Sequence, residues 1–127
     1  MNRAIIAVGS NKDPWKNIKR AREAISDHLR LTQESQFRET ISIGEVKQPD
    51  YINGVWLVET NKTQSQLKDF LKSLEEQLGR IRGEAPSSLI TIDLDIVVWN
   101  NQVVHPDVWE REFVKQAVLE VEPGITF

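Results

Sequence analysis

The alternation of two helical segments with four strand-forming segments constrains the fold of this 127-residue chain more than any other feature. The second helical segment is the clearest, because Thr63 and Gln66 form a capping box and Gly79 provides a C-terminal stop. The apolar residues between them recur on one helical face: Leu67, Phe70, Leu71, Leu74 and Leu78. These features predict an amphipathic helix that packs on a larger element.

The first helical segment is predicted to begin at Pro14, with Asp13 as its N-cap, and to end near Arg30. Four segments rich in β-branched, aromatic or apolar residues are predicted strands: 4–8, 36–43, 51–59 and 90–99. The order β-α-β-β-α-β is that of the split β-α-β, or ferredoxin-like, arrangement. We therefore expect an α+β fold, with an antiparallel four-stranded sheet and helices packed mainly on one face.

The rest of the chain adds little to this outline. Residues 116–121 are predicted to form a short helix, and residues 31–37 show no clear pattern. Without a linker, internal repeat or low-complexity tract, residues 1–127 are expected to form a single domain.

Composition excludes several classes of function. The chain has no Cys, which rules out disulfides, thiolate metal sites and cysteine nucleophiles. A net charge of −3 argues against general affinity for nucleic acid. The apolar run near the N-terminus is too short for a signal peptide, and no run approaches the roughly 20 residues of a membrane span. We expect a cytoplasmic protein that binds neither nucleic acid nor a membrane.

Asp93 and Asp95 are the sharpest chemical feature of the sequence. Residues two apart on a strand share one face, about 6.6 Å apart, so both carboxylates are expected on the open side of the sheet. The alternating apolar residues are expected to face the core: Ile92, Leu94, Ile96 and Val98. Two neighbouring carboxylates favour a cation between them, and their hard oxygens suit Mg²⁺ together with substrate phosphates. The alternative is a solvated polar face.

Arg80 and Arg82 lie just upstream of this pair. Guanidinium groups close to metal-binding carboxylates are what a polyphosphate requires, because each fork donates to phosphate oxygens while the metal neutralises further charge. Phosphoryl chemistry is therefore the leading class of function. The alternative is that the two arginines only complement the macrodipole of the preceding helix.

Aromatic and amide side chains form a second group of candidates. Tyr51 and Asn53 share one face of their strand, and together offer a stacking surface and a two-way hydrogen-bonding group for a flat heterocycle. The alternative is core packing by Tyr51, with Asn53 capping a turn. Further along, His105, Arg111 and Phe113 supply a candidate general acid, another guanidinium and another ring.

Five blocks of the sequence occur together in one known family. They are residues 9–11 (GSN), 48–53 (QPDYIN), 79–82 (GRIR), 91–97 (TIDLDIV) and 105–113 (HPDVWEREF). In this order and spacing they resemble the 6-hydroxymethyl-7,8-dihydropterin pyrophosphokinases of folate biosynthesis. The resemblance spans nearly the whole chain. It implies a ferredoxin-like fold and transfer of the β,γ-pyrophosphate of ATP to the hydroxymethyl group of the pterin, with release of AMP.

The resemblance also implies roles for individual residues. Asp93 and Asp95 would bind two Mg²⁺ ions that bridge the triphosphate of ATP, the co-substrate, and would act in catalysis with Arg80 and Arg82. The residues expected at ATP are Glu75, Arg80, Arg82, His105 and Arg111. The residues expected at the dihydropterin are Thr40, Ile43, Gly44, Tyr51, Asn53, Asp93 and Phe113. The ring would lie between Tyr51 and Phe113.

Several positions depart from the family pattern. Ile90 stands where members usually carry an arginine that contacts the reacting phosphates. Residues 44–50, on the pterin side, and the segment between Asp95 and His105 are shorter than usual. These differences leave open an alternative, a catalytically impaired paralogue that binds a pterin or nucleotide in a regulatory or sensing role. The sequence indicates no particular oligomeric state.

Overall fold

The computed structural model describes residues 1–40, 50–80 and 89–127. The elements follow one another as β1 (Asn2–Ser10), α1 (Pro14–His28), β2 (Arg30–Glu34), β3 (Arg38–Thr40), β4 (Tyr51–Thr60), α2 (Gln64–Gln77), β5 (Asp93–Trp99), β6 (Gln102–Val103), α3 (Asp107–Glu110) and α4 (Glu112–Val121). The strands form one antiparallel sheet in the order β2-β4-β1-β5-β6, and β3 also pairs with β4. This confirms the α+β, ferredoxin-like arrangement that the sequence predicts, although the described sheet has six strands rather than the expected four.

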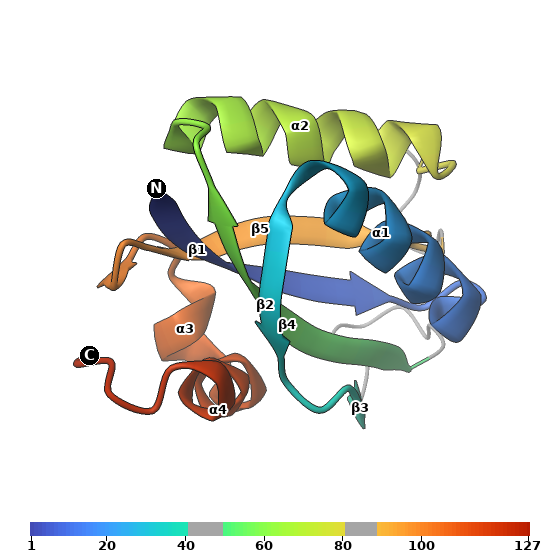
Figure 1. The fold of residues 1–127 in the computed structure, drawn as a ribbon. Coiled ribbons are helices and arrows are strands. Elements are labelled where there is room, and N and C mark those ends of the chain that lie inside the picture. The colour runs from blue at the N-terminus through green and yellow to red at the C-terminus, as the bar shows by residue number, and fades with distance from the viewer. Residues whose placement is uncertain (41–49, 81–88) are drawn as a thin grey trace.

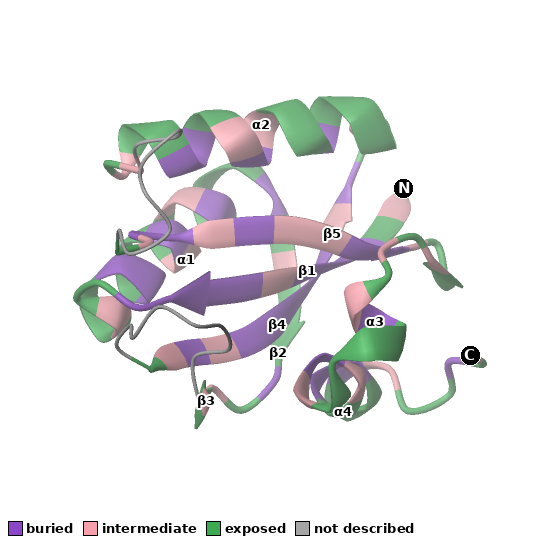
Figure 2. Cartoon of the chain, turned by 180° about the vertical axis from the view of Figure 1, so that it is seen from behind, coloured by how far each residue is buried: buried purple, intermediate pink, exposed green. Residues whose placement is uncertain are grey.

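Helices cover both faces of the sheet (Figure 1). On one face α1 and α2 bury a core that includes Ile6 and Val8 of β1. On the other face α4 packs on Ile5 of β1 and on Val55 and Leu57 of β4, and Figure 2 shows α3 and α4 at one end of that face. The two long helices α1 and α2 therefore share a face, and α3 and α4 leave part of the second face open beside β5.

Local sequence accounts for how the two long helices begin. Thr63 and Gln66 form the predicted capping box, in which each side chain accepts from the backbone N–H of the other residue. Asp13 does occupy the N-cap position of α1, but its backbone is left-handed and its side chain makes no capping hydrogen bond.

Among the described helices, none is long and apolar enough to cross a membrane.

A β-bulge changes the face to which the end of β5 points. Ile5 pairs with Val98 and Ile6 pairs with Ile96, so Val97 is an extra residue opposite β1. Leu94 and Ile96 pack on the side of α1 and α2, whereas Val97 and Val98 pack on the side of α4. The expectation that Val98 shares a face with Leu94 is therefore wrong, because strict alternation stops at the bulge.

Other element boundaries also differ from the expectations. β2 lies where the sequence shows no pattern, since four of its five residues are exposed and give no apolar alternation. β5 begins at Asp93 rather than 90, and α4 begins at Glu112 rather than 116. β3 ends at Thr40, and residues 41–43 of the predicted strand lie outside the described residues. The short elements β6 and α3 were not predicted.

Candidate active site

The two aspartates stand in one row with residues of the neighbouring strands. In the sheet register Gly9 of β1 lies between Asn53 of β4 and Asp93 of β5, and Ala7 of β1 pairs with Asp95. Cross-strand partners point to the same face of a sheet. The register therefore brings the acidic pair and the amide of Asn53, which are about 40 residues apart in the sequence, onto one surface.

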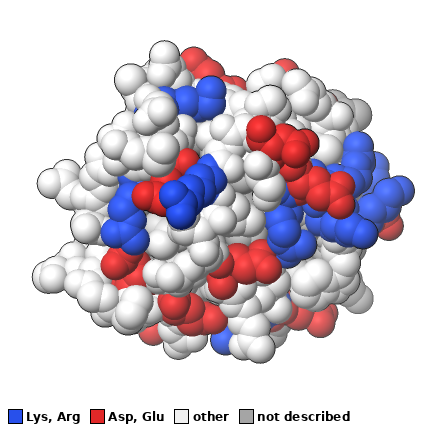
Figure 3. All heavy atoms as spheres, in the orientation of Figure 1, with Lys and Arg blue, Asp and Glu red and all other residues white. Residues whose placement is uncertain are grey.

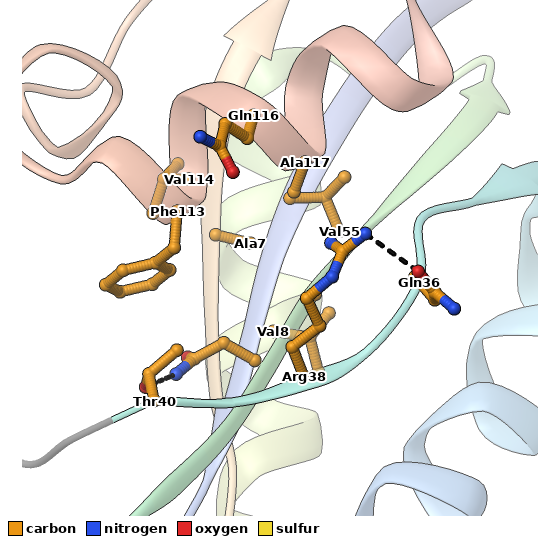
Figure 4. Close-up of a pocket in the computed structure, with 12 residues that line it drawn as sticks. Ala7, Val8, Gln36, Arg38, Thr40, Val55, Phe113, Val114, Gln116 and Ala117 are labelled. Atoms are coloured by element: carbon orange, nitrogen blue, oxygen red, sulfur yellow. Dashed lines mark hydrogen bonds between the residues drawn. The ribbon is translucent and has the colours of Figure 1, made fainter.

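A cavity of about 270 Å³ opens over this row. Its floor includes Gly9, and its walls carry the two aromatic residues that the sequence singles out, Tyr51 on β4 and Phe113 on α4. Figure 4 shows Phe113 reaching from α4 toward Thr40, in the smaller cavity of about 50 Å³ next to it. Both rings therefore border the same space as Asp93, and we call this space the aromatic cavity.

The amide of Asn53 is held in place at this cavity from two sides. Its Nδ2 donates a hydrogen bond to Oγ1 of Thr40 on β3. On the other side, a Cβ atom added to Gly9 would lie 2.6 Å from Oδ1 of Asn53, closer than van der Waals contact allows. Glycine at position 9 thus leaves the space that the Asn53 side chain occupies.

Side chains of α2 bind the outer edge of β5. In the described part of the chain β5 pairs with β6 at Val98 and Trp99, so no strand lies beside Leu94 on that edge. The Leu94 N–H donates to Oε2 of Glu75 at 2.6 Å, and its carbonyl accepts from Nζ of Lys72 at 2.9 Å. Both backbone groups are therefore satisfied by a helix, which fixes β5 where it carries the two aspartates.

Two cations contact the acidic pair directly. Nη1 of Arg80 lies 2.9 Å from Oδ1 of Asp93 and 3.1 Å from Oε1 of Glu75. Nζ of Lys72 lies 3.1 Å from Oδ1 of Asp95 and 3.2 Å from Oε2 of Glu75. Glu75 is completely buried, so its carboxylate joins both cations from beneath the surface. The result is a chain of ion pairs from Asp93 to Asp95.

Burial and a neighbouring carboxylate dominate the electrostatics of Asp93. Its pKa rises from 3.8 to about 6, first because burial disfavours the charged form and second because Asp95 repels it. Arg80 acts in the opposite direction without cancelling these effects. Burial and the charge of Asp93 also raise the pKa of Tyr51. A further cation at this position would relieve the repulsion between the two carboxylates.

The donor set fits Mg²⁺ bound together with a phosphate ligand. Asp93 and Asp95 supply hard carboxylate oxygens on one face, and Mg²⁺ is usually held by one or two carboxylates plus substrate phosphates. Among the described residues, no cluster of three or more acidic, His or Cys side chains forms a metal cage. The residues present therefore suit an ion whose remaining ligands come from substrate and water.

A second cavity, of about 560 Å³, also borders Asp95. Lys72 of α2 and His105 of the loop before α3 line it, and Asp95 lines both cavities. Nδ1 of His105 accepts a hydrogen bond from the backbone N–H of Asp107 at 3.1 Å, so this bond does not involve Nε2. We call this second space the lysine cavity.

Arg111 instead belongs to the aromatic cavity. Its Nε lies 3.3 Å from Oδ1 of Asp107, and both residues line that cavity. His105 and Arg111, both from the C-terminal block, therefore line different cavities rather than the same one.

The segment that leads into β5 is tied to the end of β1. The backbone N–H of Ile90 donates to Oδ1 of Asn11 at 2.6 Å, and the backbone N–H of Asn11 donates to the Ile90 carbonyl at 3.0 Å. The buried hydroxyl of Ser10 donates to the carbonyl of Thr91 at 2.7 Å. The GSN block thus holds the backbone at position 90 in place.

The structure brings together most of the predicted site residues. The predicted residues at the aromatic cavity are Thr40, Tyr51, Asn53, Asp93, Asp95, Arg111 and Phe113. Glu75 and Arg80 lie beneath and beside the acidic pair, and His105 lies at the lysine cavity. The predicted residues Arg82, Ile43 and Gly44 lie outside the described residues.

Sequence reasoning missed two residues that the geometry places at the site, Lys72 and Gly9. The sequence does contain a signal for Lys72. Glu75 lies four residues after Leu71, so it falls on the apolar face of the helix, and Lys72 lies three residues before Glu75. A carboxylate on a buried stripe requires a nearby cation. No local pattern indicates Gly9, whose role depends on the pairing of β1 with β4.

The outer surface carries both acidic and basic side chains (Figure 3). Figure 3 shows acidic and basic side chains next to one another on the face seen there. Ion pairs also join different elements of the described chain, such as Arg22 with Glu34 at 2.9 Å and Arg38 with Glu120 at 2.8 Å. The face therefore presents mixed charge rather than one continuous basic surface.

The ferredoxin-like sheet therefore carries an acidic pair that borders the aromatic cavity, and Asp95 of this pair also borders the lysine cavity. The comparisons identify the family more closely. Residues 5–123 match the model of the 7,8-dihydro-6-hydroxymethylpterin-pyrophosphokinase (HPPK) family, and the chain belongs to this family.

Curated relatives carry the same family name. The chain is 34% identical to the 2-amino-4-hydroxy-6-hydroxymethyldihydropteridine pyrophosphokinase of Haemophilus influenzae, over 93% of this chain and 80% of the relative. Identity to the enzyme of the same name in Bacillus subtilis is 30%, covering 94% and 78%. Identity to that of Pseudomonas aeruginosa is 28%, covering 98% and 83%. The similarity extends over most of each protein.

Proposed function

We propose that this protein transfers the pyrophosphoryl group of ATP to 6-hydroxymethyl-7,8-dihydropterin in folate biosynthesis and releases AMP. Membership of the HPPK family supports this activity. The observation that carries it is the position of Asp95, which borders the aromatic cavity and the lysine cavity at once. A group transferred between ligands in the two cavities has to pass this carboxylate.

The acceptor fits the aromatic cavity. Tyr51 and Phe113 would contact the two faces of the pterin ring, since both border the cavity and aromatic side chains stack on flat rings. The amide of Asn53, with Thr40 behind it, would pair with the donor and acceptor groups of the pterin edge. Asp93 would then lie beside the hydroxymethyl group. Ile43 and Gly44 are proposed to frame the same ring.

The nucleotide fits the lysine cavity, with its polyphosphate toward Asp95. His105 would contact phosphate from this side, and Arg80 and Arg111 would approach it from the side of the acidic pair. Arg82 is proposed to bind phosphate as well. Glu75 is proposed to act through Arg80, because its carboxylate is buried beneath that guanidinium. Fixed guanidinium groups stabilise negative charge that grows on the phosphate oxygens in the transition state.

Asp93 and Asp95 are proposed to hold Mg²⁺, as two ions, when ATP is bound. The metal would neutralise phosphate charge and align the triphosphate with the acceptor hydroxyl. The residues of the protein would then orient the two substrates. The hydroxyl has to approach the β-phosphorus opposite the oxygen that leaves with AMP. The raised pKa of Asp93 also suits a group that lies next to this hydroxyl.

The family comparisons do not favour the catalytically impaired paralogue. Ile90 stands where the resemblance leads us to expect an arginine, and the backbone of Ile90 is anchored by the side chain of Asn11. We propose that the cations around Asp93 and Asp95 supply the required charge without an arginine there. Residues 1–127 are further proposed to act as a single domain.

The proposal is tested by steady-state formation of AMP from ATP, with Mg²⁺ and with the pterin present or absent. Asp95→Asn removes one carboxylate charge and is expected to lower kcat by about a hundredfold or more, the effect of losing a transition-state contact. Asp69→Asn makes the same change at an exposed position of α2 and is the matched control. A rate of AMP formation that does not depend on the pterin, or equal values of kcat in the two variants, would reject the proposal.

A further inference from the structure

Lys72 makes contacts that fix its ammonium group beside Asp95. Nζ has three hydrogens and lies within hydrogen-bond distance of three acceptors: the Leu94 carbonyl at 2.9 Å, Oδ1 of Asp95 at 3.1 Å and Oε2 of Glu75 at 3.2 Å. The ammonium is therefore held in one place rather than moving freely on its long side chain.

The same side chain is partly open to a ligand. Lys72 has 31% of its side chain exposed, and it lines the lysine cavity together with Asp95 and His105. A lysine that served only to bind the edge of β5 would not need to face a cavity. Here the charge lies between the structural carboxylate of Glu75 and the space that the nucleotide is proposed to occupy.

A competition follows from this position. The ammonium occupies Oδ1 of Asp95, which is one of the oxygens that Mg²⁺ would bind. In the absence of ligand, Lys72 therefore neutralises this carboxylate and opposes the entry of a free cation. When Mg²⁺ arrives with a polyphosphate, the ion takes over the neutralisation of Asp95, and the ammonium then faces phosphate oxygens.

We propose that Lys72 is a positioning residue with two states, the counter-ion of Asp95 in the ligand-free protein and a phosphate-facing cation when Mg²⁺ and the nucleotide are bound. The second state rests on the proposed function. The first concerns the ligand-free protein alone. Together they supply a positive charge on the nucleotide side of the site, in a chain whose residue 90 is not cationic.

The first state is tested by titrating the ligand-free protein with Mn²⁺, followed by electron paramagnetic resonance. Lys72→Gln removes the charge but keeps a donor for the Leu94 carbonyl, and we expect it to bind Mn²⁺ about tenfold more tightly, as for the loss of one charged contact. Lys72→Arg keeps the charge, so its Mn²⁺ affinity should stay near that of the unmodified protein. Thermal unfolding of each variant confirms that it is folded.

A matched control separates the contact from a general change of charge. Lys68 lies one turn earlier on α2 and lines the same cavity, so Lys68→Gln alters the net charge in the same way. We expect its gain in Mn²⁺ affinity to be at most a small part of that of Lys72→Gln. Equal gains in both variants, or no gain in Lys72→Gln, would overturn the counter-ion role.

The second state predicts the opposite sign for the nucleotide. At saturating Mg²⁺, Lys72→Gln should weaken binding of a non-hydrolysable ATP analogue by about tenfold, while the KM of the pterin stays unchanged. Lys72→Arg should restore most of the nucleotide affinity. Analogue affinity unchanged in Lys72→Gln would overturn this state. Absence of pterin-dependent AMP formation in the unmodified protein would instead reject the proposed function, and the Mn²⁺ titration would still decide the first state.

Discussion

Gly9 and Asn53 lie opposite each other on β1 and β4, and the amide oxygen of Asn53 occupies the space that a side chain at position 9 would fill. A Cβ atom at position 9 would lie 2.6 Å from that oxygen and 3.7 Å from the ring of Tyr51. The conformation of one proposed pterin contact therefore depends on the absence of a side chain on the central strand.

Gly9→Ala is predicted to displace the Asn53 amide and raise the KM of the pterin. We expect an increase of about tenfold, the cost of a hydrogen bond that is no longer made well, with the KM of ATP unchanged. Gly124→Ala is the matched control, because a Cβ there would meet no atom within 4 Å. Steady-state kinetics with each substrate varied in turn measures both constants, and an equal rise in both would contradict the assignment.

Tyr51 is predicted to act through its ring rather than its hydroxyl. Tyr51→Phe keeps the ring, so its pterin KM should stay within about twofold, whereas Tyr51→Leu should raise it up to about tenfold through the loss of aromatic stacking. The same leucine substitution at Phe113 should have a similar effect. Calorimetric titration with the pterin checks the prediction, and loss of affinity in Tyr51→Phe equal to that in Tyr51→Leu would show that the hydroxyl matters instead.

Glu75 is predicted to be essential for stability. It is completely buried and binds Lys72, Arg80 and the Leu94 N–H, so Glu75→Ala leaves the buried Leu94 N–H without this acceptor and removes one carboxylate from each cation, which should lower the free energy of unfolding by about 1–3 kcal/mol. Glu76→Ala, at the exposed neighbouring position, should change it by less than about 0.5 kcal/mol. Urea unfolding measures both values. A Glu75→Ala protein of unchanged stability would show that this network does not support the fold.

The raised pKa of Asp93 predicts how stability depends on pH. Because its pKa is 3.8 ordinarily and about 6 in the folded protein, the folded state binds this proton more tightly than the unfolded state. The resulting stabilisation is complete below pH 3.8 and is lost as the pH rises through 6. Asp93→Asn does not titrate, so it should remove this component from the metal-free protein between pH 4 and 7, whereas Asp69→Asn should retain it. Identical pH profiles for Asp93→Asn and the unmodified protein would contradict the shift.

The same shift predicts competition between protons and Mg²⁺. A carboxyl that is protonated near pH 6 is a poor metal ligand, so Mg²⁺ binding in the presence of ATP should weaken as the pH falls below 6. Calorimetric titrations at pH 5 and pH 7.5 measure the difference. An affinity that does not change with pH would indicate that Asp93 is not a ligand.

The parts of the fold that local sequence encodes could be predicted. The capping box of Thr63 and Gln66 defines the start of α2 without any tertiary contact, and the apolar run of residues 51–59 gives the central part of β4. The pair of Asp93 and Asp95 was also identified correctly as sharing a surface, because both precede the bulge at Val97.

The parts that depend on pairing between distant segments could not be predicted. β2 has no buried residue, so it is a strand only because β4 lies beside it. The bulge at Val97 arises from the register of β5 on β1, and the space at Gly9 arises from the register of β1 on β4. Lys72 reaches Asp95 only because α2 packs along the open edge of β5.

Product analysis by ³¹P nuclear magnetic resonance tests the central claim most directly. The protein, ATP, Mg²⁺ and 6-hydroxymethyl-7,8-dihydropterin are combined, and the phosphorus signals are followed as the reaction proceeds. Transfer of a pyrophosphoryl group predicts AMP and a pterin diphosphate in equal amounts, with no ADP and no reaction when the pterin is left out. ADP as the nucleotide product, or pterin that stays unmodified while both ligands bind, would contradict the account.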